Sequence, residues 1–272
     1  MNITVTLHGA AGEVTGSAYQ VQTRNASVLV DFGLFQGRHL AENVNHIPSQ
    51  VKVKELDAVV LTHGHLDHTG RLPLLAHENY EGPIFATPAT IDITRLILED
   101  AAKIQEQDAE RNNRKRADKG KPPIPPLFNS QDVATISERF RPLPYVEPVT
   151  IAPGISVRMF EAGHILGSAS IEMTVEDSGV KRVIVFSGDI GPTNAPILND
   201  PACLSRGDLV FMESTYGDRD HRSIEETIQE FRQLVKNAVA QKGKILVPTF
   251  AVGRAQVMLY HLANMFREGI VD

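Results

Sequence analysis

Four side chains that can bind a metal ion occupy one run of six residues, directly after a predicted buried strand. The run is His63-Gly-His-Leu-Asp-His68, with three histidines and one aspartate. Residues 57–61 before it are apolar and rich in β-branched side chains, as expected for a buried strand, and residues 71–76 after it are predicted to begin a helix. The chain must therefore fold so that a strand end and a helix start hold these side chains together.

The spacing of the run favours a metal site over a polar turn with surface histidines. In an extended segment His63, His65 and Asp67 point to one side, and His68 swings round as the chain turns into the helix. Imidazole nitrogen suits zinc, and a carboxylate adds an oxygen ligand that can hold a second divalent ion. We therefore expect zinc, with two ions as the working hypothesis.

Length and composition limit the classes of protein that remain. The 272 residues, 42% of them hydrophobic, can form one large domain or one domain and part of another. No apolar run reaches the roughly 20 residues that cross a bilayer, so we expect a cytoplasmic protein without a membrane segment. Cys203 is the only cysteine, which excludes a thiolate-rich zinc finger. The net charge of −6 argues against coating nucleic acid by bulk electrostatics, although a local basic surface or metal ions could hold a phosphate backbone.

Two blocks of strand-like segments predict two sheets packed face to face with helices outside, an αββα four-layer sandwich of the α/β class over residues 1–207. The first block is expected at 3–7, 18–22, 27–31, 57–61 and 83–86, and the second at 145–151, 155–160, 169–175 and 182–187. A Glu-Asp-Ser-Gly turn at 176–179 is expected to join the last two strands.

Between the blocks the pattern becomes helical from residue 89 and is expected to end near 109. A basic window from Arg111 to Lys121 follows, and then the proline-rich stretch 122–126, which cannot continue a helix. We interpret this part as an exposed insertion, either solvated or in contact with an anionic polymer.

Residues 208–272 predict the start of a second α/β domain with parallel strands. A strand at 209–212, a helix from Ser223, a strand at 244–248 and a helix from 252 or 253 alternate in a βαβα order. Ser223 and Glu226 fit a capping box. So short a sheet would leave apolar edges uncovered, and we expect the chain to be truncated within this domain.

Several residues outside the run follow predicted strands and could complete the site. His164 and Asp189 lie in glycine-flanked turns; each alone is better explained as structural, but together they supply the ligands that two ions need. Asp31 at a strand end is expected to orient the ligand loop. Glu213 is expected at a crevice of the second domain, and Arg254, beside a helix N-terminus, is a candidate phosphate contact or a solvated side chain.

Taken together, Asp31, the run from His63 to His68, His164 and Asp189 resemble the metallo-β-lactamase superfamily in order and context. Residues 211–219, with Glu213, and residues 248–256 resemble the opening of a β-CASP domain, the branch that processes nucleic acids. The likeness is to RNA-processing hydrolases related to the cleavage and polyadenylation specificity factor nuclease subunit, which begin with a segment similar to residues 9–17.

This resemblance implies roles for individual residues. His63, His65 and His164 would bind one zinc ion, and Asp67, His68 and Asp189 the second, with Asp189 bridging the two. A hydroxide shared by the ions would attack phosphorus, and Asp67 would orient it. Glu213 would support a later histidine of the family, which has no counterpart in these residues; the later metal-ligand histidine is absent as well. Ser214, next to Glu213, and Arg254 are the expected substrate contacts.

The function expected from the resemblance is a zinc-dependent ribonuclease that cleaves single-stranded RNA. The alternatives are a small-molecule hydrolase such as a thioesterase or lactonase, because the metal motif does not choose among them, and a noncatalytic RNA-binding or partner subunit. A homodimer is the expected candidate assembly.

Overall fold

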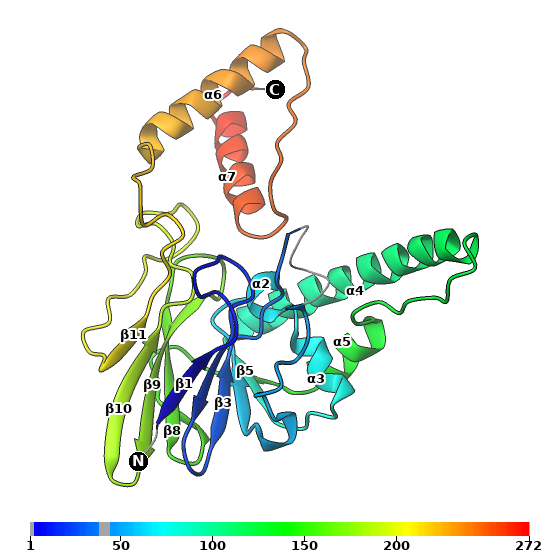
Figure 1. Cartoon of the computed structure of the whole chain (residues 1–272). Helices are drawn as coiled ribbons and strands as arrows, with labels where there is room; N and C mark the ends of the chain where they lie inside the picture. Colours follow the sequence, from blue (N-terminus) through cyan, green and yellow to red (C-terminus); the bar gives the residue numbers. More distant parts are fainter. Residues whose placement is uncertain (1–2, 38–43, 272) are drawn as a thin grey trace.

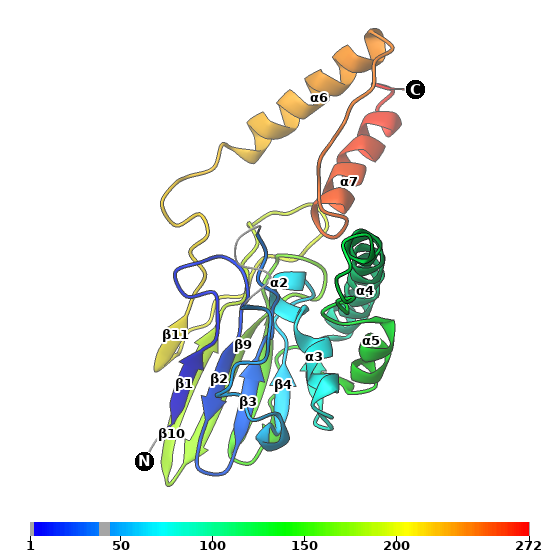
Figure 2. The same ribbon diagram turned by 45° about the vertical axis from the view of Figure 1, so that its right-hand side comes forward.

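The structure, a computed structural model, describes residues 3–37 and 44–271 and contains two β-sheets packed face to face (Figures 1 and 2). The first sheet has six strands, in the spatial order β1 (Thr4–Leu7), β2 (Tyr19–Gln22), β3 (Ser27–Val30), β4 (Ala58–Val60), β5 (Ile84–Ala86) and β6 (Phe140–Pro142). The second has five, in the order β11 (Leu209–Phe211), β10 (Val180–Phe186), β9 (Ala169–Asp177), β8 (Ile155–Glu161) and β7 (Val149–Ala152). The expected mixed α/β class with two sheets is confirmed.

The helices connect and flank these strands. Those that lie in the described ranges are η1 (Val53–Glu55), α2 (Leu66–Thr69), α3 (Leu72–His77), α4 (Pro88–Ala117), α5 (Ser130–Ser137), α6 (Ile224–Ala240) and α7 (Arg254–Arg267). None of the helices in the described ranges combines the length and apolar character that crossing a membrane requires.

Two apolar cores hold the layers together. Between the sheets, alternate residues of facing strands meet, such as Val28 and Val30 of β3 and Val157 and Met159 of β8, all 1% exposed or less. The other face of the first sheet, including Leu29, packs against helices α3, α4 and α5. Strand β3 is buried on both faces, in keeping with the apolar run Val28-Leu-Val30 that follows Ser27.

The connections between strands are of two kinds. Strands β1 to β3 and β7 to β10 are antiparallel neighbours, and the predicted turn before β10 forms with Ser178 and Gly179 both at positive φ. Strands β3 to β6, however, are parallel. Parallel strands require crossovers, and η1 and helices α2 to α5 lie in these connections.

Helices α6 and α7 lie beyond the strand ends and not over the second sheet (Figures 1 and 2). They pack against each other through a small cluster that includes Val235 and Met265. The outer face of the second sheet carries the ion pair of Arg158 with Glu172 (2.6 Å). In the described ranges, helices α3 to α5 therefore cover the outer face of the first sheet, whereas α6 and α7 extend past the strand ends (Figures 1 and 2).

Helix α4 is longer than the sequence predicted, because it ends at Ala117 and not near residue 109. Ion pairs one turn apart, Arg111 with Asp108 and Arg114 with Glu110, support the added turns. Basic residues in the last turn also suit the negative end of the helix dipole. The helix still stops before the prolines.

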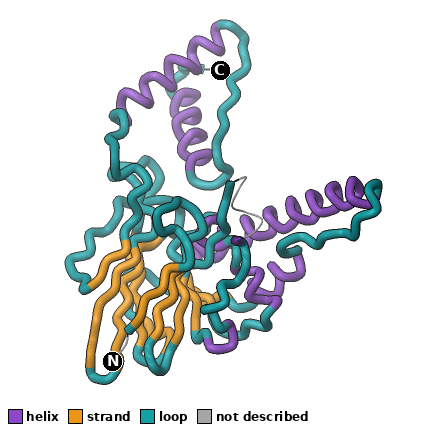
Figure 3. Tube along the Cα trace, viewed as in Figure 1, coloured by secondary structure: helices purple, strands orange, loops and turns teal. Residues whose placement is uncertain are grey.

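Both strands expected in residues 208–272 differ from the prediction. Strand β11 forms, but it pairs in parallel with β10 of the second sheet and does not begin a separate sheet. Residues 244–248 form no strand; they lie in the loop between α6 and α7 (Figure 3), where Leu246 is 93% exposed. A strand needs a hydrogen-bonded neighbour, and β11, the expected one, lies at the edge of the second sheet and does not align with residues 244–248. The helices form as expected, and Ser223 caps α6. The domain boundary near residue 207 stays a prediction.

Candidate metal centre

The candidate site lies at one edge of the sandwich, where several strands end. Strands β3 and β4 are parallel, and so are β8, β10 and β11, because β9 runs antiparallel to both β8 and β10 and β11 is parallel to β10. The segments that follow these strands contain the predicted site residues Asp31, the run His63 to His68, His164, Asp189 and Glu213. The backbone N–H of Ala169 donates to the carbonyl of Thr62 (2.8 Å) and so joins the two sheets beside the site.

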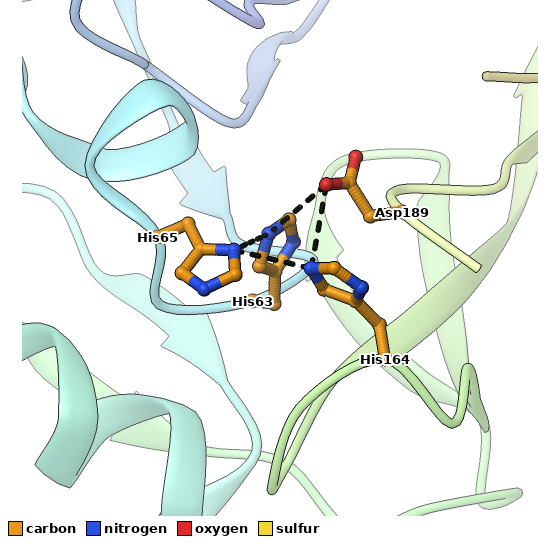
Figure 4. Close-up of side chains that lie close together, drawn as sticks. All are labelled: His63, His65, His164 and Asp189. Atoms are coloured by element: carbon orange, nitrogen blue, oxygen red, sulfur yellow. Dashed lines mark hydrogen bonds and ion pairs between the residues drawn. The ribbon is translucent and has the colours of Figure 1, made fainter. Parts of the chain in front are cut away.

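Four predicted ligands converge in space (Figure 4). One ligand atom from each of His63, His65, His164 and Asp189 lies within 4.8 Å of the other three. The Nδ1 atom of His65 is 3.1 Å from Nε2 of His63 and 3.1 Å from Nε2 of His164. The Oδ2 atom of Asp189 is 3.4 Å from Nε2 of His164 and 3.7 Å from Nε2 of His63.

These spacings fit a tetrahedral zinc ion. Two ligand atoms at about 2.0–2.1 Å from one tetrahedral ion stand about 3.3–3.4 Å apart, close to the observed distances. Three imidazole nitrogens and a carboxylate oxygen are also the donor set that such an ion accepts. The group therefore fits a metal ion.

Burial favours the neutral form of the three clustered imidazoles. It lowers the pKa of His65 and His164 below the ordinary value, and that of His63 well below it. Neighbouring imidazoles add to the effect, because a proton on one ring disfavours a proton on the next. Neutral imidazole is the form that binds metals.

A second arrangement links His68 to both Asp31 and Asp189. Nδ1 of His68 lies 2.7 Å from Oδ2 of Asp31, and its Nε2 lies 3.3 Å from Oδ1 of Asp189. Asp31, 1% exposed, also accepts hydrogen bonds from the backbone N–H and the hydroxyl of Thr62, each at 2.8 Å. Burial disfavours the charged imidazole, but the two carboxylates outweigh it and raise the pKa of His68 well above its usual value.

Asp67 and Asp189, the two aspartates predicted as metal ligands, differ in their electrostatic surroundings. Burial acts to raise the pKa of Asp189, but the hydrogen bond and charge of His68 and the charges of His164 and His65 hold it below its usual value. Burial raises the pKa of Asp67, and its proximity to Asp189 adds to this. The charge of Asp67 is therefore incompletely compensated by the protein, as expected for a carboxylate that can hold a cation.

Glu213 contacts the loop that carries Asp189. Its Oε1 accepts a hydrogen bond from the backbone N–H of Ile190 (2.7 Å), and its own backbone N–H donates to the hydroxyl of Ser187 (3.0 Å). The residue after Asp189 is thus tied to the end of β11. Glu213 also acts electrostatically on His164.

The two predicted substrate contacts lie in different surroundings. Arg254 begins α7, close enough to His164 for its charge to lower that pKa, while a Cβ on the preceding Gly253 would meet Ile165 at 2.8 Å. Ser214 lies in the turn after β11, where its carbonyl accepts from the N–H of Gly217 (3.0 Å).

Residues 11–248, most of the chain, match the metallo-beta-lactamase superfamily. The chain belongs to the metallo-beta-lactamase superfamily. The expected fold and family are therefore confirmed.

Two curated relatives share substantial sequence identity with this chain. Ribonuclease TTHA0252 of Thermus thermophilus is 42% identical over 254 residues, which cover 93% of this chain and 53% of the relative. Transcription termination factor FttA of Methanococcus maripaludis is 33% identical over 268 residues, 97% of this chain and 40% of the relative. The chain thus spans about half or less of these relatives, which belong to the RNA-processing β-CASP branch.

A crystal structure of a protein of unknown function from Enterococcus faecalis V583 matches with a TM-score of 0.51 at 17% identity. The match covers 85% of this chain and 56% of that protein, and it supports the fold alone.

The structure of this superfamily member adds residues that the sequence did not single out. The hydroxyl of Thr62 lies within 3.3 Å of nitrogens of both His63 and His68, besides its bond to Asp31. The hydroxyl of Ser168 accepts from the backbone N–H of His164 (3.0 Å). The position of Thr62, directly before the histidine run, could have indicated a role for it at the site. No feature of the sequence indicates the contact of Ser168 with His164.

Proposed function

We propose that this chain carries the active site of a metal-dependent ribonuclease that cleaves phosphodiester bonds of single-stranded RNA. The observation that carries the proposal is the group of His63, His65, His164 and Asp189, whose ligand atoms have the spacing of a zinc site. The names of the sequence relatives, a ribonuclease and a transcription termination factor, favour RNA as substrate over a thioester or lactone.

Two zinc ions are proposed, held by different residues. His63, His65 and His164 would bind the first ion, and Asp67 and His68 the second. Asp189 would bridge them, which is supported by the way its oxygens divide: Oδ2 lies toward His63 and His164, and Oδ1 toward His68.

The protein groups around the ions would set their orientation. Asp31 engages Nδ1 of His68 and so leaves Nε2 directed at Asp189 as the ligand atom. Asp67 would orient the attacking water, and Arg254 and Ser214 would contact the substrate. When bound, the ions would lower the pKa of a coordinated water and neutralise charge on the scissile phosphate.

Glu213 would act on this reaction through the Asp189 loop, because it accepts the N–H of Ile190. The cytoplasmic location and the homodimer expected from the sequence stay predictions.

The test combines metal content with RNA cleavage. We expect about two zinc ions per chain by mass spectrometry, and cleavage of an end-labelled single-stranded RNA that a chelator abolishes. Asp189→Asn and His65→Ala should lose metal and cleavage together. His77→Ala serves as the control, because His77 is 46% exposed in its side chain and pairs with Asp132 outside the group. Full cleavage after removal of all metal, or by Asp189→Asn, would contradict the proposal.

A further inference from the structure

Helix α4 begins beside the candidate metal centre. The hydroxyls of Thr87 and Thr90 at its start both donate to the carbonyl of Gly167, at 2.7 and 2.8 Å, in the loop that carries His164. The last buried residue of the helix is Ala102, so the turns from 103 to 117 leave the body of the protein (Figure 1). At about 1.5 Å per residue, the 30-residue helix is about 45 Å long.

The segment after α4 returns along the helix and is tied to it; residues 103–126 together form what we name the α4 arm. The side chain of Asn113 accepts from the N–H of Ile124 (2.8 Å) and donates to its carbonyl (2.9 Å). Arg116 donates to the carbonyl of Pro122 (2.8 Å). Four prolines between 122 and 126 stiffen the returning chain. The tip of the arm is therefore held at a defined distance from the metal centre.

The tip is strongly basic in an otherwise acidic chain. Residues 111–121 contain six lysines and arginines and one acidic residue, Asp118, whereas the whole chain has a net charge of −6. Arg111 and Arg114 are paired with acidic residues. Lys115, Lys119 and Lys121 are exposed, and within the described ranges none of the three forms an ion pair.

Helix capping does not account for these lysines. A cation in the last turn, such as Lys115, can be explained by the helix dipole, whose effect is confined to that turn. Lys119 and Lys121 lie beyond the end of the helix at Ala117. Their exposed side chains on the tip are therefore available to an anionic partner.

We infer that the basic tip of the α4 arm binds the phosphate backbone of an RNA strand whose cleaved bond lies at the metal centre. This inference rests on the proposed function, which supplies an extended polyanion as the substrate. The arm, residues 103–126, contains no aromatic side chain on which a base could stack. Contact is therefore through phosphates, so it is independent of sequence and weakened by salt.

The length of the arm makes binding depend on the length of the RNA. Phosphates of one strand are spaced about 3.4 Å apart in a duplex and farther in an extended strand, so about 45 Å corresponds to at most about 13 nucleotides. An RNA of about 30 nucleotides can reach both the site and the tip, whereas one of about 6 nucleotides cannot.

The test compares Lys115→Gln/Lys119→Gln/Lys121→Gln with Lys52→Gln/Lys54→Gln/Lys181→Gln in the whole chain. The control removes the same charge from exposed lysines outside the arm. Dissociation constants are measured on the zinc-loaded chain with phosphorothioate-linked forms of both RNAs, which resist cleavage, at several salt concentrations, after circular dichroism has verified folding. For the long RNA we expect the arm variant to bind more weakly and its salt slope to fall by about 2, since each single-strand phosphate contact contributes about 0.7. The short RNA should bind all variants equally.

Several results would overturn the inference. Equal affinity of the arm and control variants for the long RNA, while the unmodified chain binds it, would contradict the arm alone and leave the proposed function standing. Preference of the arm for polyglutamate over RNA would indicate a protein-like partner and also contradict it. No binding of either RNA by the unmodified chain would count against the arm and the proposed function together.

Discussion

At the scale of residues, the candidate site depends on hydrogen bonds that set the direction of each ligand. Asp31 receives three close contacts from His68 and Thr62 while its own backbone is left-handed, with φ of 57°. Aspartate tolerates that conformation better than bulky residues do. The carboxylate thereby fixes the ring of His68, and Glu213 fixes the loop of Asp189 in a comparable way.

The contact of Glu213 with Ile190 predicts an effect on metal affinity. Glu213→Ala removes the acceptor and should weaken zinc binding about 10- to 100-fold, the usual range for an outer partner of a metal site. Glu213→Gln keeps an amide oxygen for the same N–H and should bind zinc nearly as well as the unmodified chain. Competition with a chelator of known affinity measures this, with the exposed Glu225→Ala as control. An equal loss of zinc affinity in the Ala and Gln variants would show that Glu213 acts through its charge and not through the hydrogen bond to Ile190.

The lowered pKa values of the clustered imidazoles predict how stability of the metal-free chain changes with pH. Below about pH 6.5, His63, His65 and His164 bind protons in the unfolded chain more readily than in the folded chain. The free energy of unfolding should therefore decrease as the pH is lowered. The pKa of His68 is raised by folding, so below pH 6.5 this residue is protonated in both states and does not change the pH dependence of stability. Above pH 6.5 it makes the free energy of unfolding decrease as the pH rises. Urea unfolding with a chelator at pH 5 to 7.5 measures this. A free energy that rises on acidification below 6.5 would contradict the assignment.

At the scale of elements, helix α4 has two parts with different roles. Up to Ala102 it is part of the core of the first sheet. Beyond Ala102 the helix is held by exposed ion pairs and hydrogen bonds, including those from Ser130 at the start of α5 to Glu106. Local ion pairs and side-chain to backbone bonds contribute little to global stability because they are exposed to water.

This division predicts contrasting effects of two substitutions in α4. Leu98→Ala, at a fully buried position, should lower the free energy of unfolding by about 2–5 kcal/mol. Asn113→Ala should change it by less than about 0.5 kcal/mol, yet speed amide hydrogen exchange at Ile124, whose N–H loses its acceptor. Denaturant unfolding and hydrogen exchange measure the two quantities. Unchanged exchange in Asn113→Ala would mean that the returning segment is not held by this bond.

At the scale of the whole molecule, the sequence predicted most strands, because apolar alternation and turn residues are local signals. It also predicted which residues meet at the site, because ligand type and strand ends are visible in the chain. Strand partners are not local. The sequence therefore could not show that β11 pairs with β10, or that residues 244–248 would remain unpaired. The contact of Glu213 with Ile190 was hidden for the same reason, since it follows from that pairing.

The most direct test of the central claim is a crystal structure of the zinc-loaded chain with anomalous scattering measured at the zinc edge. The account predicts one peak about 2.0–2.1 Å from Nε2 of His63, Nδ1 of His65 and Nε2 of His164. It predicts a second peak beside Nε2 of His68, with Asp189 between the two ions. Zinc bound elsewhere, or no zinc within this group, would contradict the account.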